Sequence, residues 1–451
     1  MSDCPGGLAS EATRPNIVFL HWHDLGRYLR TYGINVDTPH IDALASRSVL
    51  FRAAFSAAPL CSPARGAIFT GRYPHSNGLM GLSHLGWEYH AEEVTLPMYF
   101  SAAGYTTHLI GMQHETSDPS TLGYDEFQNL NAPEQYAQPV AALAEITISQ
   151  LDPTRNFLLN VGLFEPHRPW PAALYPPVDP ETVTVPGFLP DTPAVRADLA
   201  AFCGAIECAD TATGRILSAL GEREFAHPTI IVFTTDHGIA FPGAKSTLHD
   251  AGIEVSLIMS VPGGPAGISS DRLVSHVDIL PTLLDLAGLP VPRRVQGRSF
   301  ADEFTGAPGY LSRTSIFAEK NWHDPDDYDP VRAIRTSTHK LIVSYEERDR
   351  IPLPGDIAAS ASARALAWSP APKRARRELY DLVSDPYEQV NLADSRDAEG
   401  VYQSLSDQLE AVQRHTGDPI LDGPIPAPRA PGRLPAAIRS RTRPIDPETG
   451  L

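Results

Sequence analysis

The chain has 451 residues, 42% of them apolar, which is enough for two domains with ordinary hydrophobic cores. Its formal net charge of −18 argues against nucleic acid as a partner, because binding to a phosphate backbone needs a basic surface. The sequence has no run of about 18 apolar residues and no N-terminal basic segment followed by an apolar stretch, so we expect a cytoplasmic protein without a membrane span.

Up to about residue 300, short apolar strands alternate with helices. The strands are predicted over residues 16–20, 48–55, 105–110, 156–164, 229–235 and 255–260. The helices are predicted over residues 39–45, 61–70, 96–103, 193–220 and 278–287. This alternation predicts an α/β fold with a large, mainly parallel sheet sandwiched by helices.

The last third of the chain has shorter strands separated by turns, predicted over residues 316–318, 331–336, 340–345 and 378–382, and then a helix over 401–414. We expect a smaller C-terminal α+β domain built on an antiparallel sheet. The expected division is a flexible N-terminus at 1–13, the α/β domain at 14–305, the α+β subdomain at 306–418 and a proline-rich tail at 419–451.

Polar residues follow four of the predicted strands: His23-Asp24, His114, His167 and Asp236-His237. In an open α/β sheet the binding crevice lies beyond the carboxyl ends of the strands, so we expect these side chains to converge. Carboxylates such as Asp24 and Asp236 suit Ca²⁺ or Mg²⁺, and each also has an alternative role as a turn or cap residue. The histidines could bind an anion, transfer protons or be purely structural.

Cys61 lies at the predicted start of the helix over 61–70, where backbone N–H groups favour the binding of an anion. Arg65 follows one turn later on the same side and can bind anionic oxygens with its guanidinium fork. Lys245 lies just after the strand that ends at Asp236, within reach of the same edge. A nucleophile, cations and a metal site together indicate displacement at a tetrahedral oxyanion, whether phosphorus or sulfur. A buried structural cysteine beside a surface arginine is the alternative.

The segment Cys61-Ser62-Pro63-Ala64-Arg65, with Thr70-Gly71, resembles the signature of the sulfatase family. Further segments resemble family motifs in the same order along the chain, at 14–16, 24–26, 38–44, 104–114, 166–169, 235–238 and 378–393. Within the family, the segments 188–193, 196–200 and 238–242 resemble the sulfamidase (heparan N-sulfatase) branch.

This resemblance implies that a formylglycine-generating enzyme converts Cys61 to formylglycine, whose hydrate attacks sulfur. It implies that Arg65 holds the formylglycine and that His114 assists its turnover. His167 and Lys245 would bind the sulfate and protonate the leaving group. The substrate would be a small sulfated anion, with a sulfate ester or N-sulfate on a sugar such as glucosamine.

The resemblance also implies one divalent metal, with Ca²⁺ expected and Mg²⁺ or Mn²⁺ as alternatives. Its ligands would be Asp24, Asp236 and His237, together with His23 and the residue formed from Cys61. His23 departs from the family, which usually has an acidic residue there.

A second departure is Met112, which stands where the family has a lysine two places before the catalytic histidine. Arg168, His108 or another group could replace the missing cation. Two other functions remain open from the sequence, namely a phosphonate monoester or phosphodiester hydrolase on the same scaffold and a non-catalytic relative.

Loop residues at the predicted rim could contact the sugar: His84, Trp87, His90, Trp170, His323 and Asp324. We favour His323 as a substrate-binding residue, because it follows a strand of the C-terminal domain and could close over the cleft. The sequence gives no indication of oligomeric state.

Overall fold

The computed structural model describes residues 14–128, 134–309, 311–323, 327–348, 351–366 and 374–428. The predicted N-terminal segment 1–13, most of the predicted tail and the rim candidate Asp324 lie outside these residues. Among the described residues, no helix is both long enough and apolar enough to cross a membrane. The predicted cytoplasmic location and the predicted division at residue 305 stay predictions.

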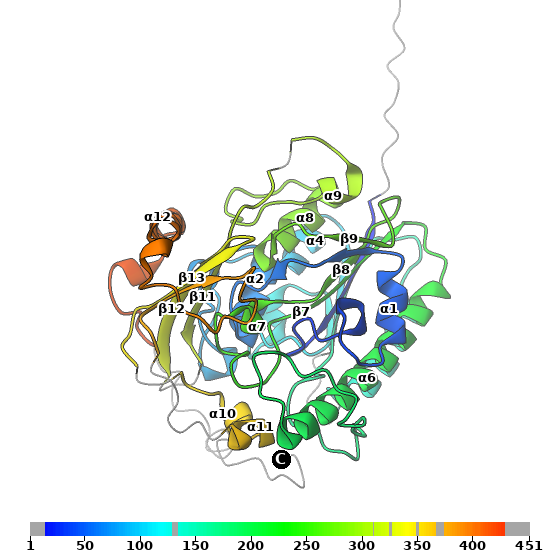
Figure 1. Cartoon of the computed structure of the whole chain (residues 1–451). Helices are drawn as coiled ribbons and strands as arrows, with labels where there is room; N and C mark the ends of the chain where they lie inside the picture. Colours follow the sequence, from blue (N-terminus) through cyan, green and yellow to red (C-terminus); the bar gives the residue numbers. More distant parts are fainter. Residues whose placement is uncertain are drawn as a thin grey trace, which may run out of the picture.

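A mainly parallel eight-stranded sheet forms the centre of the molecule, in the order β5-β4-β6-β1-β7-β8-β2-β9 (Figure 1). Its strands are β1 (Asn16–Trp22), β2 (Val49–Phe51), β4 (Thr106–Gly111), β5 (Glu126–Gln128), β6 (Phe157–Gly162), β7 (Thr229–Thr235), β8 (Leu257–Ser260) and β9 (Ile268–Ser270). Only β8 runs antiparallel to its neighbours β7 and β2. The predicted α/β class is therefore confirmed.

One predicted strand, over 48–55, is wrong as a single element. A turn at Arg52-Ala53 divides it into β2 and β3 (Ala54–Phe55). The second piece leaves the large sheet and pairs with β10 (Val274–Ser275).

Alternating side chains of β1 supply two hydrophobic layers, one on each face of the sheet. Val18, Leu20 and Trp22 pack in one core, while Ile17 and Phe19 pack in the other. The first face is covered by α1 (Pro39–Ala45), α5 (Ala137–Gln150) and α6 (Pro193–Gly221). The second is covered by α2 (Cys61–Thr70), α4 (Leu96–Ala102) and α8 (Ile279–Leu286). The sequence predictions omit α5.

The smaller sheet is antiparallel, in the order β11-β12-β13-β14, as predicted. Its strands are β11 (Ile316–Trp322), β12 (Tyr328–Arg335), β13 (His339–Ser344) and β14 (Arg377–Asp381), and α12 (Glu399–Thr416) packs against it. Figure 1 shows this sheet and α12 on one side of the molecule and the long helix α6 on the other. The short helices are α3 (Pro74–Asn77), α7 (Asp250–Ile253), α9 (Asp302–Thr305), α10 (Gly355–Ala358) and α11 (Ala361–Ala365).

Candidate active site

The centre of the site is formed where the adjacent parallel strands β1 and β7 end together. Their register pairs Trp22 with Thr235, so His23-Asp24 and Asp236-His237 leave the sheet side by side. The backbone N–H of Asp24 donates to Asp236 Oδ1 at 3.0 Å. Asp24 has a φ of 55°, in the left-handed region that a non-glycine residue seldom adopts. The fold thus fixes both acidic residues at one buried point.

Four side chains at this point offer ligand atoms within 4.8 Å of one another: His23, Asp24, Cys61 and Asp236. All four are buried. Both ring nitrogens of His23 and the Oδ1 atom of Asp24 lack an aligned hydrogen-bond partner among the described residues. Buried polar atoms without partners are costly, and a cation would satisfy them. The donor set therefore fits a divalent metal.

His237 adjoins this cluster, with Nε2 at 3.1 Å from Asp24 Oδ1 and at 3.4 Å from Cys61 Sγ. Burial lowers the pKa of His23 to about 4, despite the opposing effect of Asp236 and Asp24. The neutral ring keeps a lone pair that can bind a metal. Burial alone would raise the pKa of Asp24, but Lys245 and the surrounding histidines lower it well below its usual value.

Cys61 begins α2, as predicted, and its side chain faces the strand-end cluster. Pro63 lies in the first turn of the helix, and Gly71 ends it with a φ of 63°. Burial raises the pKa of the Cys61 thiol well above its usual value, against the opposing effect of Lys245. The helix therefore aims a protonated thiol at the residues that could bind a metal.

Arg65 is fully buried beneath the cluster. Its Nη2 atom lies 3.2 Å from Asp236 Oδ2, and Nη1 donates to His21 Nδ1 at 2.5 Å. The sequence analysis did not identify His21, which lies on the face of β1 that packs toward α2. A histidine inside an apolar strand was the available signal. His21 orients the guanidinium that bonds Asp236.

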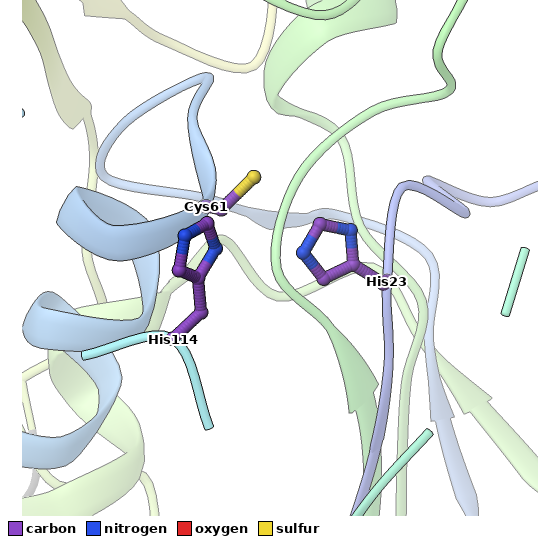
Figure 2. A group of neighbouring side chains, drawn as sticks. All are labelled: His23, Cys61 and His114. Carbon is purple, nitrogen blue, oxygen red and sulfur yellow. The ribbon is translucent and has the colours of Figure 1, made fainter. Parts of the chain in front are cut away.

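His114 lies across from His23, with Cys61 beside both (Figure 2). One ligand atom from each of the three residues lies within 4.8 Å of the others. His114 has a φ of 59°, and its Nε2 atom lies 2.9 Å from His84 Nδ1. Burial and the neighbouring His84 lower the pKa of His114 well below its usual value. Of the predicted rim residues, His84 is thus the one beside a predicted catalytic histidine.

Lys245 and His167 form the other side of the site. Lys245 Nζ donates to Asp24 Oδ2 at 2.7 Å and lies 3.4 Å from His167 Nε2. Asp356 is a further neighbour that sequence reasoning missed, with Oδ2 at 3.2 Å from Lys245 Nζ. Burial alone would lower the pKa of Lys245, but Asp24 and Asp356 raise it well above its usual value. The site therefore holds a fixed positive charge beside an imidazole.

The two residues named as replacements for the missing lysine, Arg168 and His108, each have an acidic partner of their own. Arg168 binds both carboxylate oxygens of Asp198, at 2.9 and 2.7 Å, and its guanidinium stacks on Trp170 at 3.9 Å. Trp170 is half-buried and packs on Arg168, and its contact with substrate stays a prediction. His108 lies on β4 with Nδ1 at 3.3 Å from Glu126 Oε2.

His323 follows β11 and is buried. Its contact with substrate stays a prediction. Trp87 packs near Trp322, with ring centroids 6.2 Å apart, in a small hydrophobic cluster that also contains Leu79.

Two family models match the chain. The model described as Sulfatase covers residues 15–289, and the model described as N-sulphoglucosamine sulphohydrolase, C-terminal, covers residues 241–355. The chain is 30% identical to N-sulphoglucosamine sulphohydrolase from Homo sapiens, over 86% of this chain and 88% of that protein. It is 27% identical to arylsulfatase A from Homo sapiens, over 90% and 88% of the two chains.

Solved structures share the fold. The structure of BT4656 in complex with its substrate D-glucosamine-2-N,6-O-disulfate has a TM-score of 0.69 at 19% identity, covering 91% of this chain and 99% of that one. The phosphonate monoester hydrolase of Agrobacterium radiobacter has a TM-score of 0.71 at 20% identity, covering 89% and 96%. At these sequence identities the structural similarity supports the shared fold, and the substrate has to be inferred from the residues of the site.

Proposed function

The chain belongs to the sulfatase family, and from that premise we propose that it hydrolyses a sulfate ester or N-sulfate on a sugar such as glucosamine, using formylglycine at position 61 and a divalent metal. The observation that carries this proposal is the convergence of Cys61 with His23, Asp24 and Asp236 at one buried point. These residues come from three elements far apart in sequence.

The metal would be held by Asp24, Asp236, His23 and His237, and Ca²⁺ is the ion we expect. When bound, a divalent cation polarises sulfate oxygens and stabilises the negative charge that develops on them. Arg65 fixes one ligand by its bond to Asp236 Oδ2. His21 in turn fixes the Arg65 guanidinium.

Formylglycine would supply a hydrated aldehyde as nucleophile at the start of α2. His114, whose ring lies against the Cys61 side chain, would take a proton from that group (Figure 2). Its lowered pKa leaves the ring neutral at neutral pH and able to accept a proton. Nδ1 of His84 shares a hydrogen bond with Nε2 of His114, and this bond holds the His114 ring in place.

Lys245 and His167 would bind the sulfate oxygens and serve the leaving group. The Nδ1 atom of His167 contacts the backbone carbonyl oxygen of Arg168, so Nδ1 carries the hydrogen and Nε2 faces Lys245. Burial lowers the pKa of His167. Lys245, which stays charged, would therefore supply the proton to the leaving group, and the neutral Nε2 atom of His167 beside it could pass a proton to or from Lys245.

The test is sulfate release from glucosamine N-sulfate and from O-sulfated glucosamine, with protein produced in the presence of a formylglycine-generating enzyme and Ca²⁺. Mass spectrometry of the peptide containing Cys61 measures the modification. We expect activity to rise with the modified fraction and to vanish in Cys61→Ala.

Two outcomes would overturn the proposal. Aryl phosphonates turned over orders of magnitude faster than the sulfated substrates would indicate a phosphonate hydrolase. Modified, metal-loaded protein that releases no sulfate would indicate a non-catalytic relative.

A further inference from the structure

Asp356 brings a negative charge to the side of the site that would bind an anion. Its Oδ2 atom lies 3.2 Å from Lys245 Nζ and 3.9 Å from His167 Nε2. It comes from α10, just beyond residue 355, where the match to the C-terminal family model ends.

The short segment that carries Asp356 is anchored rather than loose. Ile357 next to it is fully buried, and Ser360 caps α11 by accepting from the N–H of Ala363. Ser362 donates to Asp198 Oδ2 at 2.6 Å, and Asp198 is the carboxylate that Arg168 binds. Asp198 thus links α11 to Arg168, the residue that follows His167, so Asp356 and His167 are held in one arrangement.

The neighbours of Asp356 keep its carboxylate negatively charged. Burial alone would raise its pKa, but Lys245 and His167 lower the pKa of Asp356 to about 2. Lys245 already has a carboxylate partner in Asp24, at 2.7 Å. A second carboxylate is not needed to keep the lysine charged, and it repels a sulfate bound at the same two residues.

Lys245 donates to Oδ2 of this carboxylate, and a carboxylate with two oxygens can accept a further hydrogen bond from a ligand. Sulfate has no hydrogen-bond donor. The leaving group of a sugar has several, because its hydroxyl or amino groups adjoin the scissile bond. The side chain of Asp356 is 16% exposed, so one part of it remains accessible to a ligand.

We propose that Asp356 determines specificity by accepting a hydrogen bond from a hydroxyl or amino group of the leaving group, so that the site favours sulfated sugars over aryl sulfates that lack such a donor. This inference rests on the proposed sulfatase function. Hydrolysis consumes water: the S–O or S–N bond breaks, sulfur gains the water oxygen, and the leaving oxygen or nitrogen gains a proton. An amine released in this way becomes an ammonium ion, which the Asp356 carboxylate can bind.

The test compares kcat/KM on glucosamine N-sulfate and on 4-nitrophenyl sulfate, whose leaving group has no donor. In Asp356→Ala we expect about a 10- to 100-fold loss on the sugar, the scale of one hydrogen bond to a charged group, and less than about a threefold change on the aryl sulfate. Asp356→Asn keeps an acceptor and should lose less on the sugar. Asp191→Ala, which removes an exposed carboxylate paired with Arg196, is the matched control and should change neither substrate.

Equal losses on both substrates would overturn the proposal, because they would mean that Asp356 only positions Lys245. No loss on either would overturn it as well. Calorimetry of glucosamine binding to calcium-loaded Cys61→Ala protein gives an independent reading, and we expect affinity about tenfold weaker when Asp356→Ala is added. Wild-type protein inactive on both substrates would refute the proposed function, whereas active wild type with unchanged substrate preference in the variants would refute this inference alone.

Discussion

Two buried clusters in this protein use the same residue types, and only the first of them has a carboxylate oxygen without an aligned hydrogen-bond partner among the described residues. The strand-end cluster consists of His23, Asp24, Cys61 and Asp236. The second, which we term the Arg332 cluster, consists of His75, Glu319, Arg332 and Asp418, and it joins α3 to β11, β12 and the end of α12.

In the Arg332 cluster a fixed cation already occupies the place that a metal would take. Arg332 bonds both oxygens of Asp418, at 2.6 and 2.8 Å, and lies 3.4 Å from Glu319, which accepts from His75 at 2.8 Å. In the strand-end cluster, His23 and Asp24 keep buried atoms without aligned partners. In this cluster Lys245 and Arg65 each bond one carboxylate oxygen, and ligand atoms still remain without partners in the described part of the chain. A group of carboxylates and histidines therefore indicates a metal site when the chain's own cations leave such atoms unsatisfied.

The largest expected effect is the loss of activity in Cys61→Ala. Removing the nucleophile should lower kcat by at least about ten-thousandfold, while the melting temperature stays close to that of the wild type. Sulfate release and thermal unfolding measure the two quantities. A large fall in melting temperature would mean that Cys61 is structural, as in an ordinary core.

Next is Arg332→Met, which leaves the carboxylates of the Arg332 cluster without their cation. We expect the free energy of unfolding to fall by about 3–5 kcal/mol, measured by urea denaturation. Arg414→Met, which removes an exposed pair with Glu410, should cost about 1 kcal/mol or less. If both variants lost the same small free energy of unfolding, Arg332 would not be the cation that neutralises the buried carboxylates of its cluster.

A smaller effect is expected for Asp236→Asn, which removes one charged ligand. The Ca²⁺ concentration for half-maximal activity should rise at least about tenfold, and Ca²⁺ should raise the melting temperature less than in wild type. Asp418→Asn in the Arg332 cluster serves as control, because its loss of stability should not depend on Ca²⁺. Wild-type activity that survives a chelator would defeat the metal assignment.

The last expected effect is a pH dependence and concerns Glu115, a buried carboxyl partnered by a hydroxyl instead of a cation. Tyr89 donates to it at 2.7 Å, and burial raises its pKa from 4.5 to about 8. Between these values the unfolded chain has released the proton and the folded chain retains it, so this group makes stability fall as pH rises from about 4.5 to 8, by at most about 1.4 kcal/mol per pH unit. Denaturation at several pH values should show a flatter profile in Glu115→Gln. Parallel profiles would contradict the raised pKa.

Local sequence patterns predicted the parts of the site that depend on a single element. The apolar runs of β1 and β7 located the acidic residues at their ends, and the proline and glycine of α2 located Cys61. The helix α5 was missed although Val140, Ala144 and Ile148 recur at helical spacing.

Partners that depend on tertiary packing were beyond the sequence. Arg168 follows His167, and only the position of α6 reveals that Asp198 binds it. Asp356 lies 111 residues after Lys245 on a four-residue helix, with no local pattern that connects the two. Sequence motifs thus predict which residues each element contributes to the site, and tertiary packing determines which of the charged residues form ion pairs.

The burial of Cys61 determines whether its modification can come before or after folding. Its side chain is 3% exposed, and it lies beneath segments that follow β1 and β7 in the sequence. If Cys61 is converted to formylglycine as proposed, the modifying enzyme can reach this thiol only while the chain is open, before strands separated by more than 200 residues have paired. A chain that folds first locks its cysteine away unconverted. The proposed modification would therefore compete with folding, and the outcome of that competition would set the yield of active protein.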